Sequence, residues 1–83
     1  MLSFELKQSQ TFPNEAELEV YCDREGLNAL LAQLLLLSDG RTDHVHLMTE
    51  TWGGTHLDEV PQGQKNLPVH HVKILLRQAS TAE

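Results

Sequence analysis

Apolar and polar positions alternate along the first part of the chain. Every second residue is apolar over Leu2–Leu6 and again over Leu18–Cys22. A period of two is typical of β-strands that bury one face. The segment 8–14, which is polar and contains Pro13, separates the two stretches and reads as a connection. The sequence therefore predicts two half-buried strands joined as a hairpin.

Leucines spaced by three and four residues follow the second strand. They form one broad apolar stripe: Leu27, Leu30, Leu31, Leu34, Leu35 and Leu37. Asp23 stands where its carboxylate can accept hydrogen bonds from the free N–H groups of a first helical turn. Gly40 suits the left-handed conformation that ends many helices. We predict a helix over Arg24–Ser38 whose stripe forms the core, with Leu36, off the stripe, contacting a neighbouring element or subunit.

The second half of the chain predicts two more strands and a long loop. A strand over Asp43–Thr49 would place Val45 and Leu47 on one face and His44, His46 and Met48 on the other. The last strand is predicted over Val69–Arg77. Between them, residues 53–68 are rich in Gly, Gln, Asn and Pro and show no clear period, which predicts a loop.

The predicted order ββαββ defines an α+β fold, a four-stranded, mainly antiparallel sheet with one helix on one face. A chain of 83 residues forms a single domain, 1–83, with a polar tail at 78–83 that we expect to fray. One helix about 10–12 Å wide cannot cover a sheet about 19 Å across. We therefore expect the long loop, the second subunit of a homodimer or a partner to cover the remainder.

The composition limits the kinds of partner that the protein can bind. Twelve acidic residues against six basic ones give a net charge of -6, which repels nucleic-acid phosphates and anionic membrane surfaces and attracts a basic protein. The leucine run Leu34–Leu37 is far too short to span a bilayer. The single Cys22 excludes an internal disulfide and a CxxC metal site. We expect a cytoplasmic protein that binds neither nucleic acid nor membrane.

Two histidines form the candidate metal site. His44 and His46 share a strand face, and His71 can approach them if the last strand pairs alongside. Three imidazoles with an open fourth position suit zinc-assisted hydrolysis. No zincin spacing is present, however, and outward-facing, solvated imidazoles hydrogen-bonded to acids are the favoured explanation. No nucleophile arrangement stands out, since Cys22 lies on the apolar side of its strand. We expect no enzymatic activity and no cofactor; a His-ligated metal protein or small hydrolase is the alternative.

An aromatic turn follows the third strand. Trp52 precedes Gly53 and Gly54, and two permissive residues after an aromatic give a shaped turn with a large amphipathic side chain at its edge. Tryptophan is strongly enriched at binding hot spots. Trp52 therefore either anchors a partner or folds back over the uncovered sheet.

Four short motifs lie in the second half of the chain. They are His44-Val-His-Leu-Met-Thr, Trp52-Gly-Gly, Leu57-x-Glu and His71-x-Lys-Ile-x-Leu. Over Asp43–Leu76 the chain resembles a small family of bacterial immunity proteins of polymorphic and contact-dependent toxin systems, the immunity protein 32-like family. The N-terminal half matches only in length and pattern. The resemblance implies a protein that binds a cognate protein toxin and blocks it without catalysis.

The residues that we expect at such an interface lie within Asp43–Val60. They are Trp52, His44, His46, Glu50, His56, Asp58 and Glu59. Trp52 is expected to be the apolar anchor, and the acids are expected to steer a basic toxin and pair with its Lys or Arg side chains. A third interpretation is a non-catalytic homo-oligomeric structural domain whose loop only seals its sheet.

Overall fold

The computed structural model describes residues 1–7 and 16–77. The predicted hairpin connection at 8–14 and the tail at 78–83 lie outside the described residues. Within the described residues the elements are β1 (Leu2–Lys7), β2 (Glu17–Cys22), α1 (Arg24–Ser38), β3 (His44–Met48), η1 (Glu50–Trp52), β4 (Leu67–Pro68) and β5 (His71–Leu75). The predicted α+β class is confirmed, and η1 is a single turn of 3₁₀-helix.

The strands form two sheets, so the prediction of a single four-stranded sheet was wrong. In one sheet β1 lies between β2 and β4, and in the other β3 pairs with β5. All three pairings are antiparallel. The long loop, predicted to have no strand, supplies β4, in which Leu67 pairs with Leu6 and Pro68 with Glu5. This short strand occupies the edge of β1 where the later strands would have to join.

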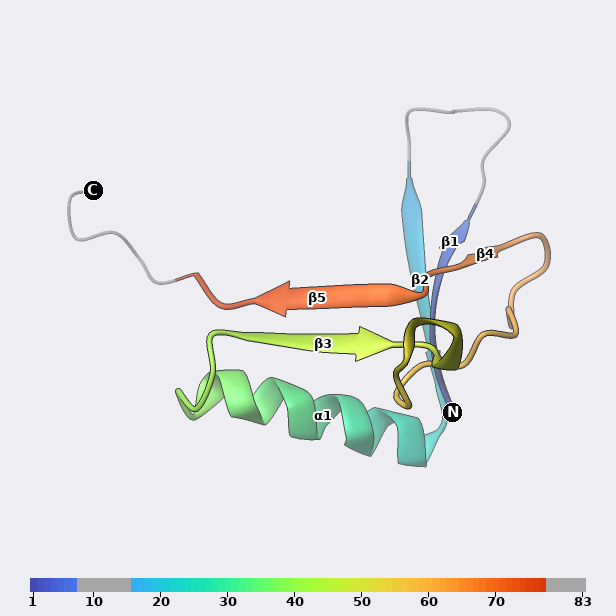
Figure 1. Cartoon of the computed structure of the whole chain (residues 1–83). Helices are drawn as coiled ribbons and strands as arrows, with labels where there is room; N and C mark the ends of the chain where they lie inside the picture. The colour runs from blue at the N-terminus through green and yellow to red at the C-terminus, as the bar shows by residue number, and fades with distance from the viewer. Residues whose placement is uncertain (8–15, 78–83) are drawn as a thin grey trace.

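The two sheets are set at a steep angle to each other. Figure 1 shows β1 and β2 rising away from the layer formed by β3, β5 and α1. The helix runs along β3, and η1 lies near the junction of the two sheets. Within the described part of the chain, no helix is long and apolar enough to cross a membrane.

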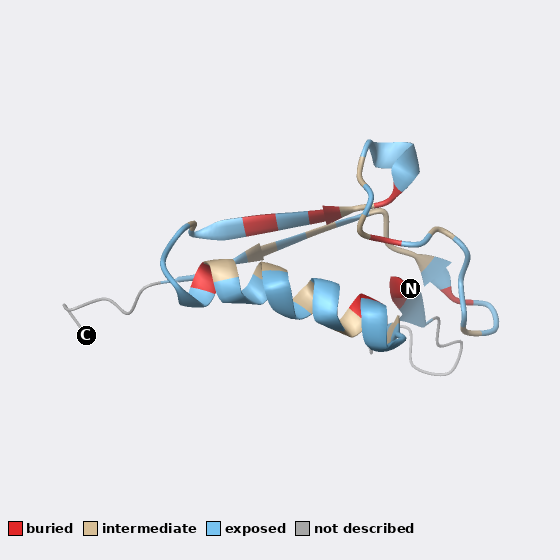
Figure 2. Ribbon diagram, turned by 90° about the horizontal axis from the view of Figure 1, so that it is seen from below, coloured by how far each residue is buried: buried red, intermediate tan, exposed pale blue. Residues whose placement is uncertain are grey.

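Local signals define α1 as predicted. The Asp23 carboxylate accepts a hydrogen bond from the N–H of Gly26 at 2.8 Å, and Gly40 adopts a left-handed φ of 76°. The bounds Arg24–Ser38 are confirmed. The leucine stripe is buried only in part: Leu37 is buried, whereas Leu31, Leu34 and Leu35 are exposed. The helix packs mainly on β3, so one flank has no described neighbour, and much of its surface is exposed in Figure 2.

The core is small and lies where the two sheets meet. It contains the buried side chains Leu2, Phe4, Leu47 and Leu57, with Leu30, Val69, Val72 and Ile74 packed against them. As predicted, β3 buries Val45 and Leu47 and exposes His44 and His46. The prediction that β2 buries its apolar face was wrong. Leu18, Val20 and Cys22 are exposed, because no described element covers that face.

A buried carboxylate connects the long loop to β1. Both oxygens of Glu5, which is fully buried, accept hydrogen bonds from Ser3 Oγ, the N–H groups of Gln62 and Gly63, and Asn66 Nδ2. Burial alone would raise the pKa of Glu5, but these hydrogen bonds outweigh it and lower the pKa to about 2. Strand β1 was predicted to bury one face, and it buries both because the loop covers the side carrying Ser3 and Glu5.

Candidate functional site

A row of imidazoles occupies the outer face of the β3–β5 sheet, opposite α1. His46 Nδ1 lies 2.7 Å from His71 Nε2, and the two rings stack at 5.0 Å between centroids. His44 meets His46 edge to face at 5.1 Å. The antiparallel pairing of β5 with β3 therefore brings His71 to the predicted histidine pair. We call His44, His46, His71 and Trp52 the histidine face.

Trp52 extends this row at the end of β3. Its ring lies 6.0 Å from that of His71, tilted by 37°, and the residue is 58% exposed. The side chain is thus not buried in the core, and it borders the imidazoles. Of the two roles that the sequence allowed, the exposed position favours contact with a partner.

Both glycines after Trp52 are required by the geometry of η1. Gly53 has a φ of 84°, in the left-handed region. A Cβ on Gly54 would lie 2.3 Å from the carbonyl oxygen of Met48. The turn closes through hydrogen bonds from the N–H groups of Trp52 and Gly54 to the oxygen of Thr49, at 3.0 and 2.9 Å. The Gly-Gly pair therefore folds the chain back onto β3 and sets Trp52 at its end.

Glu59 in the long loop and His70, the residue before β5, contact this turn. Glu59 Oε1 accepts a hydrogen bond of 2.6 Å from the N–H of Thr51, and the hydrogen bonding with Thr51 lowers the pKa of Glu59. The buried Thr49 hydroxyl lies 2.8 Å from His70 Nδ1. Glu59, predicted to contact a partner, thus positions the turn that carries Trp52, while Glu50 in η1 is exposed.

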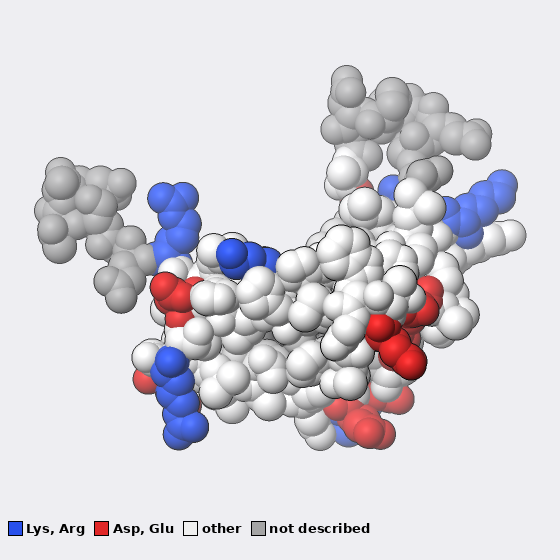
Figure 3. Space-filling view, in the orientation of Figure 1, with Lys and Arg blue, Asp and Glu red and all other residues white. Residues whose placement is uncertain are grey.

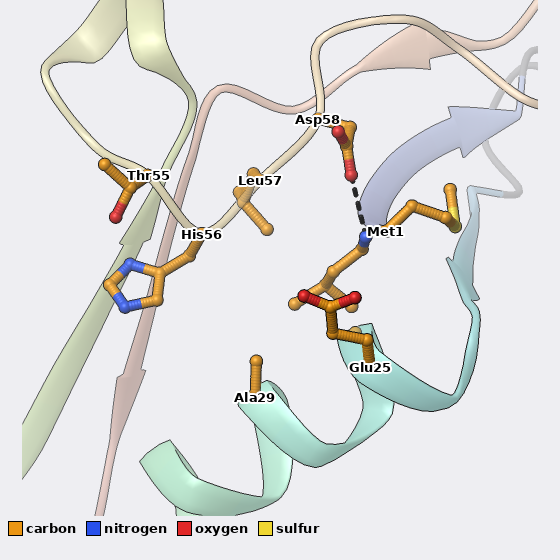
Figure 4. A pocket seen from close by; sticks show the side chains of 9 residues that line it. Met1, Glu25, Ala29, Thr55, His56, Leu57 and Asp58 are labelled. Atoms are coloured by element: carbon orange, nitrogen blue, oxygen red, sulfur yellow. Dashed lines mark hydrogen bonds between the residues drawn. The ribbon is translucent and has the colours of Figure 1, made fainter.

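His56 and Asp58 lie elsewhere, on the side of the sheet that faces α1. They line a pocket of about 260 Å³ together with residues of the first two turns of α1 and of the N-terminal segment, as Figure 4 shows. Asp58 holds β1, because its carboxylate accepts from the N–H of Leu2 and its own N–H donates to the Leu2 oxygen, both at 2.8 Å. The structure therefore brings together His44, His46, Glu50 and Trp52 from the predicted set.

The His46 ring of the histidine face favours the neutral state. Partial burial lowers the pKa of His46, and the neighbouring His71, His44 and Lys73 lower it further. The hydrogen bond between His46 and His71 needs one ring to donate and the other to accept, so at least one of them is neutral. His44 Nδ1 lies 2.7 Å from Asp43 Oδ1, which lowers the pKa of Asp43.

Most charged side chains lie around this area, and Lys73, opposite His46 in the strand pairing, lies within it. Figure 3 shows Lys, Arg, Asp and Glu mostly around the rim of the face, with acidic groups over η1 and a basic group over β5. Aromatic and imidazole rings without full charge can stack on planar cations and other rings. The arrangement therefore suits contact with an Arg-bearing or aromatic protein surface.

The alternative of a His-ligated metal protein requires a cluster of ligands, and the described part of the chain contains none. Over residues 1–7 and 16–77, no group of three or more His, Cys, Asp or Glu residues is arranged to hold a metal ion. The nitrogens of His46 and His71 that face each other are at hydrogen-bond distance, and His44 Nδ1 is directed at Asp43. Each imidazole of the histidine face thus has a nearby hydrogen-bond partner.

This geometry defines a small α+β protein that presents an exposed face of imidazole and indole rings. The chain belongs to the immunity protein 32 family, whose model matches residues 17–72, more than half of the sequence. The match runs from β2 into β5 and so includes α1, β3 and η1. It confirms the resemblance, extends it towards the N-terminus and indicates an immunity function. No curated protein and no solved structure matches the chain.

His71 is the member of the face that the predicted contact set left out. The signal for it was present, because His71 alternates with Val72 and Ile74, and the last two strands were the natural pair. Proximity along the sequence placed His56 and Asp58 in the set instead, although the chain turns at Gly53 and Gly54 and carries them to the other side of the sheet.

Proposed function

We propose that the protein binds a cognate bacterial toxin and neutralises it by occupying its surface, without a catalytic step of its own. Membership of the immunity protein 32 family supports a toxin as the partner. The observation that carries the choice of surface is Trp52, exposed at the end of an uncovered sheet face and fixed there by two glycines and Glu59. An exposed tryptophan on a rigid turn binds with little loss of conformational entropy.

The partner that fits this face carries basic side chains. The chain has a net charge of -6, which accelerates the approach of a basic protein. Glu50 is exposed in the same turn as Trp52 and would pair with a Lys or Arg of the toxin. A guanidinium group can also stack on the tryptophan or imidazole rings.

The test compares two exposed apolar residues on different sheets. Trp52→Ala should raise the rate of dissociation from the cognate toxin, with a loss of about 2–4 kcal/mol in binding free energy. Leu18→Ala is the matched control, because Leu18 is 54% exposed and lies on β2; it should leave binding unchanged. Both can be measured by surface plasmon resonance. If a folded Trp52→Ala protein binds as the wild type does, the interface lies elsewhere.

The metal alternative is tested separately. Protein purified without chelator should hold well under one zinc ion per chain by elemental analysis. Stoichiometric zinc that is lost in His46→Ala, together with stability, would replace the binding interpretation by a metal protein.

We also propose that the protein forms a homodimer, as the sequence predicts from its uncovered apolar surface. Among the described residues, six apolar side chains form the buried set, whereas eleven large apolar side chains are exposed. Soluble monomers rarely leave extended apolar surface open to water, so a second copy is the natural cover for part of it.

A further inference from the structure

Strand β5 has an edge with no described strand beside it. Its even-numbered residues bond to β3, since the N–H of Leu76 donates to Asp43 at 2.8 Å and the oxygen of His70 accepts from Thr49 at 2.9 Å. In an antiparallel pair the intervening residues point their N–H and C=O groups the other way. The backbone groups of His71, Lys73 and Leu75 therefore face the open edge. Such an edge is a template for another strand.

The outer edge of β3 is less open. The N–H of Leu57 donates to the oxygen of Met48 at 3.2 Å, and Gly54 packs against the same residue, so the returning loop closes the end of that edge. Strand β5 contains neither a proline nor a positive φ over His71–Leu75. Between the two edges of this sheet, that of β5 is the better template.

We propose that two copies of the chain join through their β5 edges, antiparallel about a two-fold axis, to form the four-stranded sheet β3-β5-β5′-β3′. Two nearby registers keep the open backbone groups in bonding positions. One opposes Lys73 to Lys73 of the partner subunit, which sets like charges side by side. The other pairs Lys73 with Leu75 of the partner subunit and centres Ile74 on the axis. The second register is the one that the side chains favour.

The side chains on β5 match their own copy in that register. Val72 lies opposite Leu76 of the partner subunit and Ile74 opposite its symmetry mate, which makes a continuous apolar ladder on the α1 side. Leu75 and Leu76 are 58% and 48% exposed. Pairing of the two β5 edges would cover part of this exposed apolar surface. This self-match identifies a second copy as the occupant.

The pairing also strengthens the weaker sheet. A two-stranded sheet is marginal by itself and needs further strands or a packed helix, and α1 runs along the β3 side of this one (Figure 1). A two-fold axis perpendicular to the sheet places both histidine faces on the same side, opposite both helices. The dimer would then offer two equivalent toxin-binding faces side by side, although the dimer itself does not rest on toxin binding.

Charge substitutions at Leu75 test both the edge and the register. Light scattering with size exclusion should give the wild type twice the monomer mass of 9.4 kDa. In Leu75→Lys, the new lysine of each chain lies opposite Lys73 of the partner subunit, so the dimer contains two pairs of like charges. This variant should raise the dimer dissociation constant at least about tenfold. Leu75→Glu changes the same exposed position to the opposite charge and should keep the dimer intact. Circular dichroism checks that both variants stay folded.

Other results overturn the proposal. A wild type that stays monomeric at several hundred micromolar removes the dimer, and particles larger than two chains remove the closed two-fold pairing. Equal weakening by Leu75→Lys and Leu75→Glu rules out the register. A further variant, Leu35→Lys on the open flank of α1, separates the two apolar surfaces. If Leu35→Lys dissociates the dimer and Leu75→Lys does not, the copies meet through the helices.

Discussion

Replacing Glu5 by glutamine tests whether a buried charge holds the long loop in place. Glu5 and Gln have nearly the same shape, so the substitution removes the charge and turns one acceptor oxygen into a donor NH₂. In the folded protein each carboxylate oxygen accepts two hydrogen bonds, one pair from Ser3 and Gln62 and the other from Gly63 and Asn66. If the NH₂ faces Gly63 and Asn66, two donors face a donor; if it faces Ser3 and Gln62, the Ser3 hydroxyl can turn to accept and one backbone N–H faces a donor.

The size of the effect follows from the hydrogen bonds of Glu5 and from the lowered pKa that they cause. Each charge-assisted hydrogen bond contributes about 1.5–3 kcal/mol, so losing one or two costs about 1.5–6 kcal/mol. The pKa of Glu5 falls from its ordinary value of 4.5 to about 2, which corresponds to about 3 kcal/mol of preference for the folded state. We expect Glu5→Gln to lower the free energy of unfolding by about 3 kcal/mol. A domain of this length has about 4–12 kcal/mol in total, so the variant should retain only about 1–9 kcal/mol.

The same carboxylate predicts an acid-sensitive fold. Because its pKa is lower in the folded protein than in the unfolded chain, the stability from ionised Glu5 is fully present above pH 4.5. It should be lost as the pH falls from 4.5 towards 2, where the folded protein also takes up the proton. Glu5→Gln has no such group and should lack this part of the acid dependence.

Urea unfolding followed by far-UV circular dichroism at pH 7 and at several values between 5 and 2 measures both effects. Glu17→Gln is the matched control, because Glu17 is exposed and its nearest cation, Lys7, lies 3.6 Å away with both side chains largely exposed; such pairs contribute about 0–1 kcal/mol. The reasoning is refuted if Glu5→Gln costs no more than Glu17→Gln, or if its acid dependence equals that of the wild type.

Two glycine substitutions test close contacts of the backbone. Gly54→Ala would place a Cβ 2.3 Å from the oxygen of Met48. It should displace η1, weaken toxin binding and lower the free energy of unfolding by about 1–3 kcal/mol. Normal toxin binding by this variant would contradict the role of the turn. Gly26→Ala would place a Cβ 1.6 Å from the Met1 oxygen and should lower the melting temperature more than Gly40→Ala. Gly40 has open space around it, so an alanine there is strained only by the positive φ, at a cost of about 1–2 kcal/mol. A larger loss for Gly40→Ala would contradict the packing of the N-terminal segment on α1.

Features set by neighbouring residues were predictable from the sequence. The helix bounds follow from Asp23 and Gly40, which act within one turn of each end. The alternation around Val45 places the histidines of β3 on one face in any antiparallel arrangement. The sequence therefore predicted His44 and His46 on one face, whereas the position of His71 depended on how β5 pairs with β3.

Features set by distant contacts were not predictable. Strand β4 has two residues, too few for any periodic signal, yet it decides that the strands form two sheets. Glu5 reads as a solvent-facing residue of a half-buried strand, and only the loop that carries Asn66, 61 positions later, makes it a buried anchor. The leucines of α1 read as core, but how many are buried depends on how many strands lie above the helix.

Acidification should act on the histidine face mainly through His46. Its pKa is lowered by partial burial and by the neighbouring His71, His44 and Lys73. A base with a lowered pKa stabilises the fold above its ordinary value of 6.5, and this contribution is lost as the pH falls through 6.5 towards the lowered pKa. Protonation of both rings also breaks the 2.7 Å hydrogen bond to His71, because each facing nitrogen would then carry a hydrogen.

We therefore expect both the melting temperature and the affinity for toxin to fall between pH 7.5 and pH 5.5, with slower association as the net charge becomes less negative. His46→Gln should flatten this dependence. His56→Gln is the matched control, because His56 lines the pocket on the opposite side of the sheet and should leave most of the dependence in place. Ring nitrogen chemical shifts of the wild type locate the titration directly. An equal flattening by the two variants would mean that overall charge, and not the His46–His71 contact, controls the response.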